Sequence, residues 1–161
     1  MFPSAYNSDP DCYVRMNRTI SKLSFFGGCI LLATTGCNFV RNDNLNQAIA
    51  RGDTEAVRAA LARGVDVNGR GMHAMTPLMT AAKAGQLDIC ELLVKHGADV
   101  NGHNDSGSVL MWAIESRNES AVGFILKAGA DRSWTNALGA TAESLAQQRG
   151  LTNIVAILKT K

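Results

Sequence analysis

The sequence predicts an all-α solenoid of four helix-turn-helix repeats with short hairpin loops, preceded by a signal peptide. Two observations lead to this prediction. The residues after Cys37 align with one another at a period of about 33 residues, which is typical of repeats that stack side by side. Before Cys37, a short basic stretch is followed by an apolar run, which is the layout of a segment that directs export.

The composition fits a folded domain and gives no sign of a nucleic-acid surface. Of the 161 residues, 46% are hydrophobic and 19% are charged, and both values are ordinary for a globular protein. The formal net charge is +2, and acidic and basic residues alternate along the chain. We therefore expect an ordered domain over most of the chain and no binding to DNA or RNA.

The predicted export signal covers residues 1–37. The stretch MNRTISK from Met16 is followed by LSFFGGCILLATTG, an apolar run that is shorter than the roughly 20 residues of a bilayer-spanning helix. Residues 1–15 contain Asp9 and Asp11, which have no place in a usual signal. Both Met1 and Met16 therefore stay open as the start of translation.

The residues before Cys37 resemble a bacterial lipoprotein signal, in which the cysteine carries the lipid. Gly36 fits the position before the cysteine, whereas Thr34 stands where leucine is most frequent in that family. The resemblance implies that Cys37 is lipidated, with cleavage without lipid, an uncleaved anchor or no export as alternatives. Asn38 follows the cysteine in place of aspartate, which by the same resemblance favours the outer membrane.

The cysteines give no sign of a metal site. Cys12, Cys29, Cys37 and Cys90 stand at no spacing typical of zinc ligands, and no pair of histidines accompanies them. We therefore expect no metal and no cofactor.

Four repeat units follow a short linker of residues 38–44. They cover about residues 45–73, 74–106, 107–138 and 139–161 of a domain that spans 45–161. The same residue types return at corresponding positions: Leu45, Leu78 and Leu110; Ala48, Ala81, Ala113 and Ala146; Gly64, Gly97 and Gly129; Asp66, Asp99 and Asp131.

The second unit, MTPLMTAAKAGQLDICELLVKHGADVN, resembles the ankyrin repeat. Thr76-Pro77-Leu78 matches the start of the family motif, with Met79 where histidine is usual. The resemblance extends from Leu45 to Lys159 and implies stacked helix pairs that bind another protein.

Elementary helix chemistry accounts for the positions of proline and glycine in the repeat. Pro77 loses no hydrogen bond in the first helical turn, and Thr76 can cap the exposed amides before it. A glycine in left-handed conformation is expected to end the first helix of three units, at Gly52, Gly85 and Gly150. The third unit has Arg117 at this position, so its turn is predicted to be less favourable.

The second helix of each unit carries apolar residues at helical spacing, which predicts a core and no cofactor site. Cys90 shares the register of Val57, Val122 and Val155, so we expect a buried structural thiol. Trp112, on the first helix of the third unit, is also expected in the core.

The first and last units deviate from the repeat pattern, as capping units do. The first opens with Asn42-Asp43-Asn44, and the last has Glu143 at the usual leucine, followed by Gln147 and Gln148. We therefore expect an array that is complete at four repeats.

In ankyrin folds, the partner usually contacts the tips of the hairpin loops and the exposed side of the first helices, which form a concave face. Transferred residue by residue, this resemblance selects Arg70, Met72, His73 and Met75 on the first loop; His103, Asn104 and Asp105 on the second; Trp134, Asn136 and Leu138 on the third; and Lys83, Glu115 and Arg149 at first-helix positions.

Some of these residues are large and apolar. Met72, Met75 and Trp134 stand at loop positions that face solvent, where such side chains commonly anchor an interface. In the alternative interpretation, Trp134 folds back against the next repeat and the methionines cover the hairpin.

Nothing in the sequence indicates an enzyme. None of His73, His96 and His103 stands at a motif-like spacing from a nucleophile or a carboxylate, and no glycine-rich phosphate loop is present. We expect a lipid-anchored periplasmic module, a monomer or part of a hetero-complex, that binds one protein partner. The alternatives are an immunity protein that neutralises an antibacterial phospholipase delivered into the periplasm, and a secreted effector that acts on host proteins. As alternatives to the outer-membrane-anchored location, the protein is soluble in the periplasm or secreted.

Overall fold

The computed structural model describes residues 44–160, which all belong to one compact unit of the chain, Thr35–Lys161. The predicted export signal, with Met16 and Cys37, lies outside the described residues. None of the described helices is both long and apolar enough to cross a membrane.

The described helices come in consecutive pairs joined by tight turns. Residues 44–51 are helical and precede α3 (Thr54–Ala62); the later pairs are α4 (Pro77–Ala84) with α5 (Leu87–Lys95), α6 (Val109–Glu115) with α7 (Glu119–Lys127), and α8 (Ala142–Gln148) with α9 (Thr152–Lys159).

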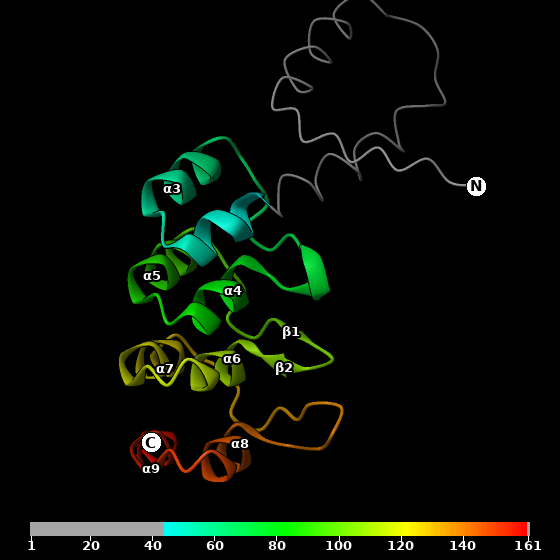
Figure 1. Cartoon of the computed structure of the whole chain (residues 1–161), viewed down its shortest axis with the longest axis vertical. Helices are drawn as coiled ribbons and strands as arrows, with labels where there is room; N and C mark the ends of the chain where they lie inside the picture. Colours follow the sequence, from blue (N-terminus) through cyan, green and yellow to red (C-terminus); the bar gives the residue numbers. More distant parts are fainter. Residues whose placement is uncertain (1–43, 161) are drawn as a thin grey trace, which may run out of the picture. The chain divides into compact units, whose positions relative to one another are not determined.

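Helices of the same kind stack on one another. The first helices form one row, in which α4 contacts α6 and α6 contacts α8, and the second helices form another, in which α3, α5, α7 and α9 contact in succession. Figure 1 shows these rows side by side, with the connecting loops projecting from the first helices away from the second helices. The prediction of an all-α solenoid is confirmed.

The loops between helix pairs differ in their local structure. The first contains a short 3-10 helix, η1 (Met72–Ala74), and the second contains an antiparallel hairpin of β1 (His103–Asn104) and β2 (Gly107–Ser108). The third has an isolated bridge between Thr135 and Thr141.

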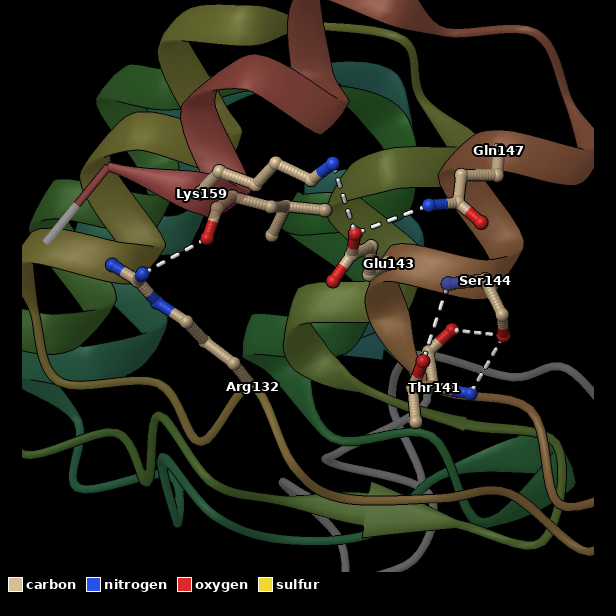
Figure 2. Close-up of polar contacts among 7 residues, drawn as sticks. Arg132, Thr141, Glu143, Ser144, Gln147 and Lys159 are labelled. Carbon is tan, nitrogen blue, oxygen red and sulfur yellow. Dashed lines mark hydrogen bonds and ion pairs between the residues drawn. The ribbon is translucent and has the colours of Figure 1, made fainter.

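Each of the three later first helices begins with a hydroxyl side chain that caps it. The Oγ1 of Thr76 accepts a hydrogen bond from the amide of Met79 at 3.3 Å, as predicted for the residue before Pro77. Ser108 caps α6 in the same way. At α8, Thr141 and Ser144 exchange hydrogen bonds in a capping box (Figure 2). Amides that would lack a partner at the helix start are thus satisfied.

The turns inside the helix pairs follow the predicted glycine pattern. Gly52, Gly85 and Gly150 have φ values of 76°, 68° and 68°, and Arg117 adopts the same left-handed conformation at 57°. This conformation is unfavourable for arginine. The next residue, Asn118, holds the turn in place: its Oδ1 caps α7, and its Nδ2 donates to the carbonyl of Gly85 at 2.8 Å.

The core lies between the two rows and between successive pairs. Leu78 and Leu110 are at most 1% exposed, and the alanines Ala81, Ala113 and Ala146 are fully buried. Because these alanines have almost no side chain, the first helices can approach one another closely. The core prediction for Cys90 is confirmed, since this residue is fully buried as well.

Asparagine side chains carry hydrogen bonds from one loop to the next. Asn68 accepts from the amide of Asp99 at 2.8 Å and donates to Gly97, and Asn101 accepts from Asp131 at 2.8 Å and donates to Gly129.

The last pair is held by a different set of polar contacts (Figure 2). Arg132 donates to the carbonyls of Leu158 and Thr160 at 2.9 and 2.7 Å, at the end of α9. Glu143, which replaces the repeat leucine, forms an ion pair with Lys159 at 3.5 Å and accepts from Gln147. Arg132 and Glu143 thus place polar groups at positions that are apolar in the preceding units.

Candidate protein-binding face

The residues selected from the sequence lie on two parts of one side of the domain. One part is the set of loops 68–75, 101–107 and 133–140. The other is the side of α4, α6 and α8 on which Lys83, Trp112, Glu115 and, at the end of α8, Arg149 lie. We call the two parts together the finger face. Figure 1 shows that the loops project in the same direction.

The first two loops are joined through predicted site residues. Arg70 donates to the carbonyl of His103 at 3.0 Å and to that of Ala74 at 3.4 Å. In return, Asn104 donates to the carbonyl of His73 at 3.1 Å and contacts the sulfur of Met75. Five predicted residues are therefore brought together: Arg70, His73, Met75, His103 and Asn104.

The tip of the first loop has an unusual backbone. His73 and Ala74 have φ values of 57° and 53°, a region that side-chain-bearing residues rarely adopt. Such a conformation costs on the order of 1–3 kcal/mol and persists only where the surroundings impose it. Here the hydrogen bonds from Arg70 and Asn104 end on the carbonyls of these two residues.

The second and third loops meet through aromatic rings. The ring centroids of His103 and Trp134 lie 5.1 Å apart, and the half-buried indole also packs against the core. The amide of Ala137 donates to the carbonyl of Asp105, and Asn136 donates to that of Ser106. Trp134 therefore lies against the preceding loop, whereas the alternative interpretation of the sequence placed it against the next repeat.

Among the described residues, the exposed large hydrophobic side chains are both on loops. Met72 is 59% exposed at the first loop, and Leu138 is 89% exposed at the third. Met75, by contrast, is half-buried against the core. Apolar side chains left in solvent at loop tips are candidates for contact with a partner.

The predicted residues on the first helices fall into two contacts. The ammonium of Lys83 on α4 lies 4.8 Å from the ring centroid of Trp112 on α6, which is within the range of a cation–π interaction. Arg149, which ends α8, forms an ion pair with Glu115 of α6 at 2.7 Å. The structure thus joins Glu115 with Arg149 but places Lys83 beside a residue that the sequence did not select.

Trp112 was predicted in the core, and the structure places it at the edge of the core. Its side chain is only half-buried, although its Nε1 is enclosed and has no hydrogen-bond acceptor among the described residues. The ring lies under the hairpin, where a methyl group on Gly107 would stand 3.6 Å from Nε1.

The register of the repeats contains the signal that could have identified Trp112 as a surface residue. Trp112 directly precedes Ala113, just as Thr80 precedes Ala81 and Leu145 precedes Ala146. All three residues that precede these alanines are half-buried in the structure. Thr80 is polar, so it indicates that this repeat position is in contact with solvent. Trp112 and Leu145, which are apolar, give no such indication.

Few titratable groups of the described residues are perturbed. Burial raises the pKa of the Cys90 thiol to about 12, with a smaller contribution from the charge of Glu91. A hydrogen bond from the Ser133 hydroxyl lowers the pKa of Asp131. His96 contacts the carbonyl of Leu92 at 2.8 Å through Nδ1. A thiol with a raised pKa is a poor nucleophile at neutral pH.

Within residues 44–160, no three His, Cys, Asp or Glu side chains converge in a way that could hold a metal ion. The geometry of the finger face is therefore one of hydrogen-bonded loops, exposed apolar tips and a tryptophan with a lysine over its ring. Such a surface can bind another molecule by contact.

Comparison with known proteins identifies the repeat. A family model described as ankyrin repeats (three copies) matches residues 45–136. A Rickettsia bellii ankyrin repeat protein is 31% identical over 124 residues, which cover 75% of this chain and 68% of that protein.

Two nematode proteins are similar to this chain over a small part of their own length. The ankyrin repeat and KH domain-containing protein mask-1 of Caenorhabditis elegans is 34% identical over 113 residues, and a transient receptor potential cation channel subfamily A member 1 homologue of the same organism is 30% identical over 105 residues. The matches cover 68% and 65% of this chain but only 4% and 9% of those proteins.

The Cys90 thiol predicts a pH dependence of stability. Up to the ordinary pKa of 9.0, the thiol is protonated in both the folded and the unfolded chain and has no effect on pH dependence. As the pH rises from 9.0 towards about 12, the thiol ionises only in the unfolded chain, so stability is lost. At about pH 10.5 the loss amounts to about 2 kcal/mol.

Urea denaturation of the wild type and of Cys90→Ala, at about pH 8 and about pH 10.5, measures this loss. The difference in unfolding free energy between the two proteins should change by about 2 kcal/mol between the two pH values, because all other groups titrate in both. An unchanged difference would show that Cys90 ionises equally in both states.

Proposed function

The chain belongs to the ankyrin-repeat family, and we propose that it is a four-repeat, lipid-anchored periplasmic module that binds one protein partner through the finger face. Ankyrin repeats are protein–protein interaction modules, whose stacked units present extended binding surfaces. The identity of the partner is a property of the surface residues and does not follow from the fold.

The observation that carries the proposed binding face is the location of the exposed apolar side chains. Met72 and Leu138 are the large hydrophobic residues that remain exposed in residues 44–160, and both belong to the loops. The backbone that presents Met72 is held by Arg70, and the loop that presents Leu138 is joined to the second loop through Asn136. A surface held in this way loses little conformational freedom when a partner binds.

The segment before residue 44 supports the proposed anchor. The basic and apolar stretches from Met16 to Gly36 lead to Cys37, and six residues, 38–43, then separate Cys37 from the first described helix, which is seven Cα–Cα steps away. At about 3.5 Å per residue, a lipid on Cys37 would hold the repeats within about 25 Å of the bilayer. The similarity to a Rickettsia bellii protein over 75% of the chain is in line with a bacterial source.

Removal of the exposed loop side chains should weaken partner binding strongly without unfolding the domain. The double variant Met72→Ala, Leu138→Ala is expected to recover at least about tenfold less partner than the wild type from cell-envelope extract, because two apolar anchors typically contribute more than 1 kcal/mol each. Quantitative mass spectrometry of the bound proteins gives the recovery.

A second double variant, Glu91→Ala and Lys127→Ala, is the matched control, since both residues are exposed on second helices. It should recover the partner as the wild type does. Equal recovery of every bound protein by all three forms would contradict binding through the finger face.

The anchor is tested by metabolic labelling with a fatty-acid analogue. The full chain should carry the label, and Cys37→Ser should lose it, because the lipid is attached at that cysteine. Cys90→Ser, whose thiol is buried, is the control and should label as the wild type. A label that persists in Cys37→Ser would overturn the anchor.

A further inference from the structure

The first helices carry positive charge that the domain does not neutralise. Their carboxylates, Glu115 and Glu143, are both in ion pairs, at 2.7 Å with Arg149 and at 3.5 Å with Lys159. Among residues 44–160, neither Arg51 at the end of the first helix nor Lys83 on α4 forms an ion pair, and Arg117 in the turn after α6 also lacks one.

Two further carboxylates lie near this side of the domain without reversing its charge. Asp53 accepts from the amide of Ala56 and so caps α3, and Asp105 lies in the second loop. The second helices, in contrast, are balanced: Glu55, Asp88, Glu91 and Glu119 stand against Arg58, Arg63 at the end of α3, Lys95 and Lys127. The surplus of positive charge therefore belongs to the first-helix side.

Lys83 and Trp112 combine this charge with apolar surface. The ammonium of Lys83 lies 4.8 Å from the centroid of the indole ring, so the cation–π attraction holds it over the face of the ring. Lys83 itself is exposed and keeps hydrogen-bond donors for another group. A carboxylate that approaches Trp112 would therefore meet a positioned cation.

Leu145 extends the apolar surface along the stack. It occupies the position of Trp112 in the next unit, is half-buried, and lies on α8, which contacts α6. On both sides of this apolar pair stand polar side chains, Lys83 on α4 and Arg149 at the end of α8. An apolar centre with a charged border is the usual composition of a binding surface.

We propose that the segment of the partner protein bound by the first helices is acidic and carries an apolar side chain, which packs on Trp112 while a neighbouring carboxylate pairs with Lys83. This inference rests on the proposed function and adds the chemistry of the partner. Positive charge without an intramolecular partner attracts acidic segments and repels basic ones, which sets both association rate and selectivity.

A random library of displayed 15-residue peptides, selected on the full chain, tests this chemistry. The enriched peptides should contain more aspartate and glutamate than the starting library, next to an aromatic or aliphatic residue. These peptides should bind Lys83→Glu at least about tenfold more weakly than the wild type, because attraction becomes repulsion. Their binding to the wild type should weaken as salt is added.

Two further variants separate the charge from its position and from folding. Lys95→Glu makes the same change in the last turn of the second helix α5 and should leave binding within about twofold of the wild type. Trp112→Leu keeps an apolar side chain against the core and should weaken binding about fivefold or more by removing the ring. Thermal denaturation of each variant shows that it is folded.

Enriched peptides without an excess of acidic residues would overturn the inference, as would acidic peptides that bind Lys83→Glu and the wild type equally. In both cases the proposed function stands if Met72→Ala, Leu138→Ala still loses its partner in envelope extract. A library that yields no binder also counts against the inference, and equal recovery from extract by all forms would then remove the proposed function as well.

Discussion

The approach of neighbouring first helices is the constraint on which the rest of the structure depends. A pair of short helices cannot bury its own apolar face, so each pair is stable only against the next. Ala81, Ala113 and Ala146 are fully buried between the helices and leave no bulk to hold them apart. The loops inherit this spacing: Asn68 and Asn101 reach the following loop only because the units stack at a fixed distance.

The finger face is a product of the same spacing. Its contacts join residues of different units, as in the pairs of Lys83 with Trp112, Glu115 with Arg149, and His103 with Trp134. No single unit contains such a pair, so the face exists only in the stacked array. The exposed side chains of Met72 and Leu138 are then presented from loops that neighbouring loops hold in place.

Features encoded within one unit could be predicted from the sequence, and features formed between units largely could not. Thr76-Pro77, the left-handed glycines and the buried Cys90 follow from local rules of capping, turn geometry and periodicity. Trp112 was misplaced because helical periodicity does not separate a core position from one at its edge. The strained backbone at His73 was also missed, since its support comes from Arg70 and Asn104, one of which lies in the following loop. The predicted site residues were selected by family resemblance. Their mutual contacts could not be predicted, because they depend on how side chains of different units are placed in space.

The most direct test of this dependence on helix approach is the unfolding free energy of Ala113→Leu, measured by urea denaturation. Ala113 lies on α6, between α4 and α8, so a larger side chain should force the first helices apart and lower the unfolding free energy by about 1–3 kcal/mol or more. Ala59→Leu, at an exposed position of α3, should change it by no more than about 0.5 kcal/mol. An Ala113→Leu variant as stable as the wild type would contradict the central role of the alanine row.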